Sequence, residues 1–138
     1  MKQSMYIFDV PTRGQRLYEC TSTISQWVEN QTIHSGLLTV FCRHTSASLL
    51  IQENADPTVC RDIEAYFNRL APQDSSYEHS SEGPDDMPAH LKTALTQVQL
   101  SIPVMLGSLA LGTWQGIYLF EHRVRPHLRK IVLHLIGE

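Results

Sequence analysis

The run GLLTVFCR at residues 36–43 constrains the fold more than any other feature of this sequence. It is apolar at nearly every position, and its length is typical of a strand. Such a continuous run indicates a central strand buried on both faces. We therefore expect a fold built around a sheet.

The remaining strand signals lie on both sides of this run. Two β-rich segments open the chain, and the intervening PTRG is turn chemistry, so a hairpin-like start is expected. Four more apolar segments fill the second half of the chain. The expected strands outside the central one are 5–10, 15–20, 98–105, 107–112, 116–123 and 130–137.

Three segments have helical spacing or capping signals. The stretch 21–36 carries apolar residues at helical spacing, with Ser22 or Thr23 as N-cap and Gly36 as a stop. The stretch 56–70 opens with a capping aspartate followed by proline at the first helical position. Its inward stripe is expected to consist of Val59, Ile63, Tyr66, Phe67 and Leu70.

A shorter helix is expected over 86–95, after a polar connection. Together these signals predict the α+β class, with a mostly antiparallel sheet and two or three helices. A chain of 138 residues fits one compact domain, which we place at 1–138.

Composition narrows the partners and the compartment. A net charge of -3 gives no electrostatic footprint for nucleic acid or acidic membranes, so small partners are expected. Three cysteines without a CxxC pair favour reduced thiols, and the N-terminal segment lacks the apolar core of a signal peptide. These observations predict a cytoplasmic protein that binds neither nucleic acid nor membranes.

Histidines occupy two polar segments. His79 and His90 flank the connection before the third helix, where a helix N-terminus would keep His90 neutral and able to bind a metal. His44 directly follows the central strand, beside Thr45 and Ser46, whose hydroxyls can hold phosphate oxygens. The alternatives are a solvated first-turn histidine and a Ser/Thr-rich turn that caps its own backbone.

Further polar candidates surround the strand at 116–123. Glycines on either side of Thr113, Trp114 and Gln115 allow a close approach that could clamp an aromatic ring, although a hairpin could also require them. Glu121 ends an apolar strand face, either at its wet end or in a site. The basic stretch 123–130 could bind pyrophosphate or form a solvated hairpin end.

Three motifs in this order resemble the YjbQ-like family, also called secondary thiamine-phosphate synthases. They are HTSASLLIQENADP, YEHSSEGPDDMPAHLK and LALGTWQGIYLFEHR, with SIPV before the last. The resemblance implies a compact α+β subunit that assembles as a homotrimer, with sites near subunit boundaries and a histidine-lined pocket for a divalent metal. The matching polar residues are His44, Thr45, Ser46, Asn54, Asp56, His79, Gly83, His90, Thr113, Trp114, Gln115 and Glu121.

On this resemblance the expected activity joins a thiazole phosphate to a pyrimidine that carries a pyrophosphate leaving group. A divalent ion, zinc or magnesium, would be bound by His44, His79 and His90. The catalytic residues would be His44, Gln115 and Glu121, and the small phosphorylated substrate would contact Thr45, Ser46, Asn54, Thr113 and Trp114. Two alternatives stay open: a metal-assisted hydrolase of a phosphorylated or ester metabolite, and a non-catalytic metabolite-binding trimer.

Overall fold

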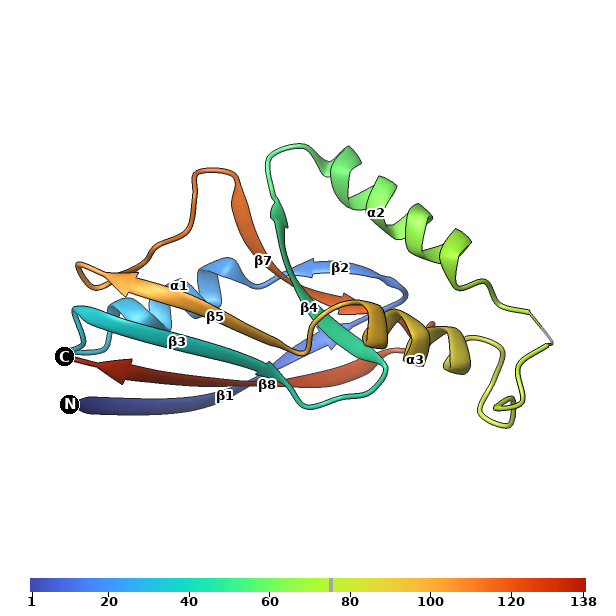
Figure 1. Cartoon of the computed structure of the whole chain (residues 1–138), viewed down its shortest axis with the longest axis horizontal. Helices are drawn as coiled ribbons and strands as arrows, with labels where there is room; N and C mark the ends of the chain where they lie inside the picture. The colour runs from blue at the N-terminus through green and yellow to red at the C-terminus, as the bar shows by residue number, and fades with distance from the viewer. Residues whose placement is uncertain (75) are drawn as a thin grey trace.

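A five-stranded antiparallel sheet forms one layer of the protein (Figure 1). The computed structural model describes residues 1–74 and 76–138. The strand order in this sheet is β1-β8-β3-β5-β6, so the first and last strands of the chain are neighbours. The strands are β1 (Lys2–Thr12), β3 (Ser35–Cys42), β5 (Gln99–Met105), β6 (Ser108–Leu109) and β8 (His127–Gly137).

A second antiparallel sheet of three strands, in the order β2-β7-β4, packs against the first. Its strands are β2 (Arg16–Glu19), β4 (Ala47–Glu53) and β7 (Gln115–Glu121). β7 is central and its side chains alternate between the two faces, as the sequence predicts. Ile117 and Leu119 pack into the main core, whereas Tyr118 and Phe120 pack on the opposite face.

Three helices accompany the sheets in the described residues: α1 (Thr21–Glu29), α2 (Pro57–Leu70) and α3 (Asp86–Leu95). α1 closes the core between the sheets with Ile24 and Val28. α2 and α3 lie at the end of the molecule away from the two chain termini (Figure 1). None of these helices is both long and apolar enough to cross a membrane.

The α+β class and the antiparallel sheets agree with the prediction. The predicted opening hairpin is wrong, because β1 pairs with β8 whereas β2 pairs with β7 in the other sheet. The first helix is also shorter than predicted and ends at Glu29. Gly36 is part of β3, where a Cβ atom would collide with the backbone carbonyl of Ile136, so close strand packing requires this glycine.

The central run is β3, as predicted, but only one of its faces is buried. Leu38 and Val40 point into the core, whereas Leu37 and Phe41 are 42% and 41% exposed. Among the described elements, α3 borders this outer face of the five-stranded sheet only near Phe41, and none covers the rest of it. Its exposed apolar residues are Met5, Ile7, Leu37, Phe41, Met105, Leu128 and Ile136.

α2 begins and ends as predicted. Its start could be predicted because the capping residues are neighbours in sequence. The side chain of Asp56 accepts a hydrogen bond from the amide of Thr58, and Pro57 occupies the first helical position. The predicted inward stripe is only partly correct, since Tyr66 and Leu70 are about half exposed. Ile63 and Phe67 do pack on β7 as predicted, together with Cys60, which was not predicted.

Candidate metal centre

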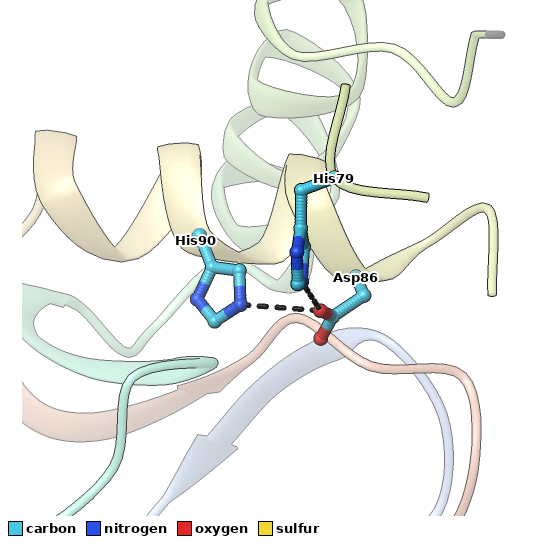
Figure 2. A group of neighbouring side chains, drawn as sticks. All are labelled: His79, Asp86 and His90. Atoms are coloured by element: carbon cyan, nitrogen blue, oxygen red, sulfur yellow. Dashed lines mark hydrogen bonds and ion pairs between the residues drawn. The ribbon is translucent and has the colours of Figure 1, made fainter. Parts of the chain in front are cut away.

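His79, Asp86 and His90 come together at the start of α3 (Figure 2). Asp86 and His90 are four residues apart on this helix, which places them on one face. His79 reaches the same point from the preceding connection. One nitrogen or oxygen from each side chain lies within 4.8 Å of the others, a grouping that can hold a metal ion.

The carboxylate of Asp86 is the centre of this cluster. Its Oδ2 atom lies 2.7 Å from Nε2 of His79 and 3.2 Å from Nε2 of His90. Donor atoms around a tetrahedral zinc ion are about 3.3 Å apart, given bond lengths near 2.0 Å. The separation to His90 is close to this value, whereas the separation to His79 is that of a hydrogen bond and would have to lengthen around a metal. His79 is exposed enough to move in this way.

The tautomer of His90 is set by the loop after β3. Its Nδ1 atom lies 3.0 Å from the carbonyl oxygen of Thr45. A carbonyl can only accept, so Nδ1 carries a proton and the lone pair of a neutral ring is on Nε2, facing Asp86. A backbone acceptor on the distal nitrogen is the usual support for a histidine that binds a metal through the other nitrogen.

Arg123 fixes the opposite side of the carboxylate. Its Nη1 atom donates to Oδ1 of Asp86 at 2.7 Å, and its Nε atom donates to Asp85 at 3.0 Å. A third bond, from Nη2 to the carbonyl of Glu82, completes the anchor. The side chain of Asp86 is 3% exposed and held in one orientation, which leaves Oδ2 directed at the two imidazoles.

The local charge favours a cation. Burial raises the pKa of Asp86, but the hydrogen bond from His79 and the nearby positive charge, that of Arg123 included, outweigh it, so the pKa is lowered and the group is ionised. The hydrogen bond to Asp86 also raises the pKa of His79, so a metal bound here would have to displace a proton from this ring. With neutral imidazoles, the carboxylates of Glu82, Asp85 and Asp86 exceed the one guanidinium by two negative charges.

The predicted set of His44, His79 and His90 is therefore corrected at one position. The ring of His44 is not part of this cluster, because its Nε2 atom accepts a hydrogen bond from the amide of Lys130 at 2.8 Å. Asp86 takes its place. The sequence contained a signal for Asp86, since an aspartate and a histidine four residues apart on a helix share a face.

Glu121 does not have the predicted role of base or ligand. It is fully buried, and one of its oxygens accepts from Thr12 and Nε of Arg129 at 2.5 and 2.8 Å. The other accepts from Arg129 and from the amides of His122 and Arg123. Burial raises the pKa of Glu121, but these bonds outweigh it and lower the pKa. All of this is the environment of a structural ion pair.

The other predicted contacts are divided between the two ends of β4 and β7. Thr45 and Ser46 precede β4 near α3, but Arg129 already binds the hydroxyl and carbonyl of Ser46. Asn54 and Gln115 lie at the far end, about 20 Å away for strands of this length. The residues at that end are engaged locally or exposed: Asn54 donates to Glu19, Gln115 accepts from Gly112, Trp114 is 63% exposed and Thr113 is exposed.

Three of the four arginines and lysines in the basic stretch 123–130 are engaged within the protein, and Arg125 is exposed. Arg123 and Arg129 are buried in ion pairs with aspartate and glutamate, and Lys130 pairs with Asp9 at 2.8 Å.

The glycine at position 83 has a φ of 104°, so its place in the connection depends on left-handed backbone.

Comparison with known proteins identifies the family. The profile described as "UPF0047 protein YjbQ-like" matches residues 6–138. The chain belongs to the YjbQ-like (UPF0047) family. The UPF0047 protein sll1880 of Synechocystis is 49% identical over 138 residues, covering 99% of this chain and 94% of that protein. The UPF0047 protein YjbQ of Salmonella typhimurium is 50% identical over 106 residues, 77% of each chain.

Solved structures of this family share the fold. A YbjQ-like protein of unknown function from Sulfolobus solfataricus superposes with a TM-score of 0.87 at 26% identity, covering 99% of this chain and all of that one. The conserved hypothetical protein TT1486 of Thermus thermophilus gives 0.84 at 33% identity, covering 95% and 99%. The family resemblance inferred from the three motifs is thus confirmed.

The function expected from that resemblance is corrected. The YjbQ-like relatives are named as UPF0047 proteins or as proteins of unknown function. These names do not support a thiamine-phosphate synthase activity. They give no support to the two alternative functions and mention no metal. The motifs identify the family without specifying a reaction.

Proposed function

We propose that this protein binds a divalent cation through His79, Asp86 and His90. The observation that supports the proposal most strongly is the bond from Nδ1 of His90 to the carbonyl of Thr45. It directs the lone pair on Nε2 of a neutral His90 at a carboxylate oxygen 3.2 Å away. Two acceptors at this separation repel each other unless a proton or a cation lies between them.

The donor set gives a preference among metals. Two imidazoles and one carboxylate suit zinc, iron(II), manganese or nickel, whereas magnesium prefers oxygen ligands. His79 and His90 are partly exposed, so a bound ion would keep coordination positions open to water or another ligand. We therefore propose zinc over magnesium as the stronger binder.

Titration calorimetry of the EDTA-treated full chain with zinc, manganese and magnesium tests the proposal. We expect one zinc per chain, and loss of that site in H79A, H90A and D86N. H34A is the matched control, because His34 is an exposed histidine outside the cluster. H44A distinguishes the two ligand sets: it keeps the zinc if Asp86 is the third ligand. Wild-type protein without a zinc site, or unchanged zinc binding in all three cluster variants, would contradict the proposal.

We also propose that the protein forms a homotrimer in the cytoplasm. The family resemblance implies the trimer, and the exposed apolar face of the five-stranded sheet supports burial against further copies of the chain. All three cysteines are free thiols, which suits a reducing compartment.

A further inference from the structure

A cavity of about 600 Å³ lies between α3 and the end of β3. This volume is in the range of small-molecule pockets. The cavity shares one wall with the metal centre, because the ring of His90 lines it. Most of the remaining wall is apolar and comes from Phe41, Ala94 and Val98. A ligand here would therefore place an apolar body against these three side chains.

His44 supplies a hydrogen-bond donor to this cavity. Its Nε2 atom accepts from the backbone amide of Lys130, so the proton of the neutral ring is on Nδ1. Burial, followed by the charge of Arg129, lowers the pKa of His44 and keeps the ring neutral. Nδ1 has no hydrogen-bond partner among the described residues. The ring is thus held by the protein with its second nitrogen free to donate.

Thr93 supplies a second unsatisfied group. A threonine within a helix usually bonds its hydroxyl back to a carbonyl one turn earlier. The hydroxyl of Thr93 is buried and finds no partner in the part of the chain that the structure describes. Thr93 lines the same cavity, but its hydroxyl oxygen is closed off from solvent, so a ligand would contact the rest of this side chain.

Arg43 gives the cavity a positive charge. Its side chain lines the cavity at an exposed position, and its guanidinium forms no ion pair or hydrogen bond within residues 1–74 and 76–138. Arg123 and Arg129, by contrast, are neutralised by buried carboxylates. A free guanidinium and an N–H donor on two residues that line one cavity are groups that can together bind a carboxylate or a phosphate.

We propose that this cavity binds a small organic anion. The carboxylate or phosphate end contacts Arg43 and Nδ1 of His44, and the apolar body packs against Phe41, Ala94 and Val98. The site goes beyond the cation site proposed above, because none of the three cation ligands carries the anion. The shared wall at His90 brings the ligand next to the metal.

Hexanoate and phenyl phosphate are the probes, and hexanol is their uncharged counterpart. Calorimetry or saturation-transfer NMR with the full chain measures their binding in EDTA and after zinc loading. We expect both anions, or one of them, to bind in EDTA more tightly than hexanol. Preference between the two probes identifies the anion as carboxylate or phosphate.

Three variants test the contacts. R43Q is expected to weaken the anions about five- to tenfold and to leave hexanol unchanged, because it removes a charge-assisted hydrogen bond. A94W fills the cavity and is expected to abolish binding of all three probes; Ala94 is exposed, so the fold tolerates the larger side chain. T93V removes the buried, unpaired hydroxyl while keeping the size of the side chain, and is expected to bind all three probes as the wild type does.

R69Q is the matched control, because Arg69 is an exposed arginine near the end of α2, outside the cavity. The proposal is overturned if wild-type protein binds neither anion at millimolar concentration, or if R43Q and A94W bind them as the wild type does. Failure of the cation proposal gives a different result from failure of the anion proposal. If only the cation proposal fails, H79A behaves as the wild type in zinc titrations, while the anions still bind in EDTA.

Discussion

Nδ1 of His90 donates a hydrogen bond to the carbonyl oxygen of Thr45 at 3.0 Å, and this bond joins α3 to the loop between β3 and β4. The contact spans 45 positions in sequence. It fixes both the rotation of the ring and its tautomer, so that Nε2 faces Asp86. The proposed cation site and the neighbouring cavity therefore depend on the same packing of helix against loop.

Arg123 should affect cation binding without being a ligand. R123Q leaves His79, Asp86 and His90 in place but removes the bond that orients Asp86. We expect zinc affinity to fall about 10- to 100-fold, the usual effect of losing a group that orients a ligand. R125Q, at an exposed position two residues along, is the control and should bind zinc as the wild type does. Zinc titration of both variants, with circular dichroism to verify folding, makes the measurement. Equal zinc affinity in R123Q and wild type would mean that Asp86 needs no such support.

Glu121 should matter for stability. E121Q leaves the buried guanidinium of Arg129 without its charged partner, since that arginine donates two bonds to this carboxylate. We expect the free energy of unfolding to fall by about 3–5 kcal/mol, the usual cost of breaking a buried ion pair. Urea denaturation measures this change. E78Q, at an exposed glutamate in the polar connection, should change stability by less than about 0.5 kcal/mol. A similar small change in E121Q would contradict the structural role.

The parts of the fold that were predicted correctly are those with local signals. α2 starts where Asp56 and Pro57 place it, because capping involves neighbours in sequence. Pairing of β1 with β8 joins the two ends of the chain, and no pattern within residues 5–20 distinguishes it from a hairpin. The exposed face of β3 escaped prediction for a similar reason, since an apolar run does not say whether the protein or another chain covers it.

The candidate site was predicted in part. His79 and His90 were recognised as a pair, and the structure brings them to one carboxylate oxygen. The family motifs predict His44 and Glu121 in the same site because they contain both residues. A motif gives the order of residues in the sequence but not the orientation or the partners of their side chains. The Lys130 amide and the Arg129 guanidinium engage these two side chains from a strand more than 80 residues beyond His44. Only tertiary structure contains that information.

The outer face of the five-stranded sheet should control assembly. Ile7 lies on β1 and is 50% exposed within a group of apolar neighbours. If further copies bury this face, I7E places a charge in the interface and should convert the proposed trimer to monomer, because an unpaired buried charge costs several kcal/mol. Light scattering coupled to size-exclusion chromatography measures the mass. Y66E alters a similarly exposed apolar residue on α2 and should remain trimeric. A wild-type monomer, or an I7E trimer, would exclude this interface.

His122 should make the protein less stable in mild acid. Its ring is fully buried against Phe120, and its Nδ1 atom has no partner among the described residues. Burial, followed by the charges of Lys92 and Arg129, lowers its pKa from 6.5 to about 3. At a pH between these two pKa values, His122 is protonated in the unfolded chain but neutral in the folded chain. The free energy of unfolding is therefore greatest above pH 6.5 and falls as the pH falls, by about 2 kcal/mol at pH 5.

Urea denaturation of wild type and H122Q at pH 7.5 and pH 5 isolates this contribution. Glutamine can keep a hydrogen bond to Ser48, which lies 2.9 Å from Nε2 of His122, but it does not titrate. The lowered pKa of His44 acts in the same direction, whereas the raised pKa of His79 acts in the opposite one, with stability lost as the pH rises above 6.5. Both histidines remain in H122Q, so the difference between the two proteins reports His122 alone. We expect H122Q to be less stable at pH 7.5 but to lose about 2 kcal/mol less than the wild type on going to pH 5. Equal losses in both proteins would mean that the buried ring accepts a proton in the folded state.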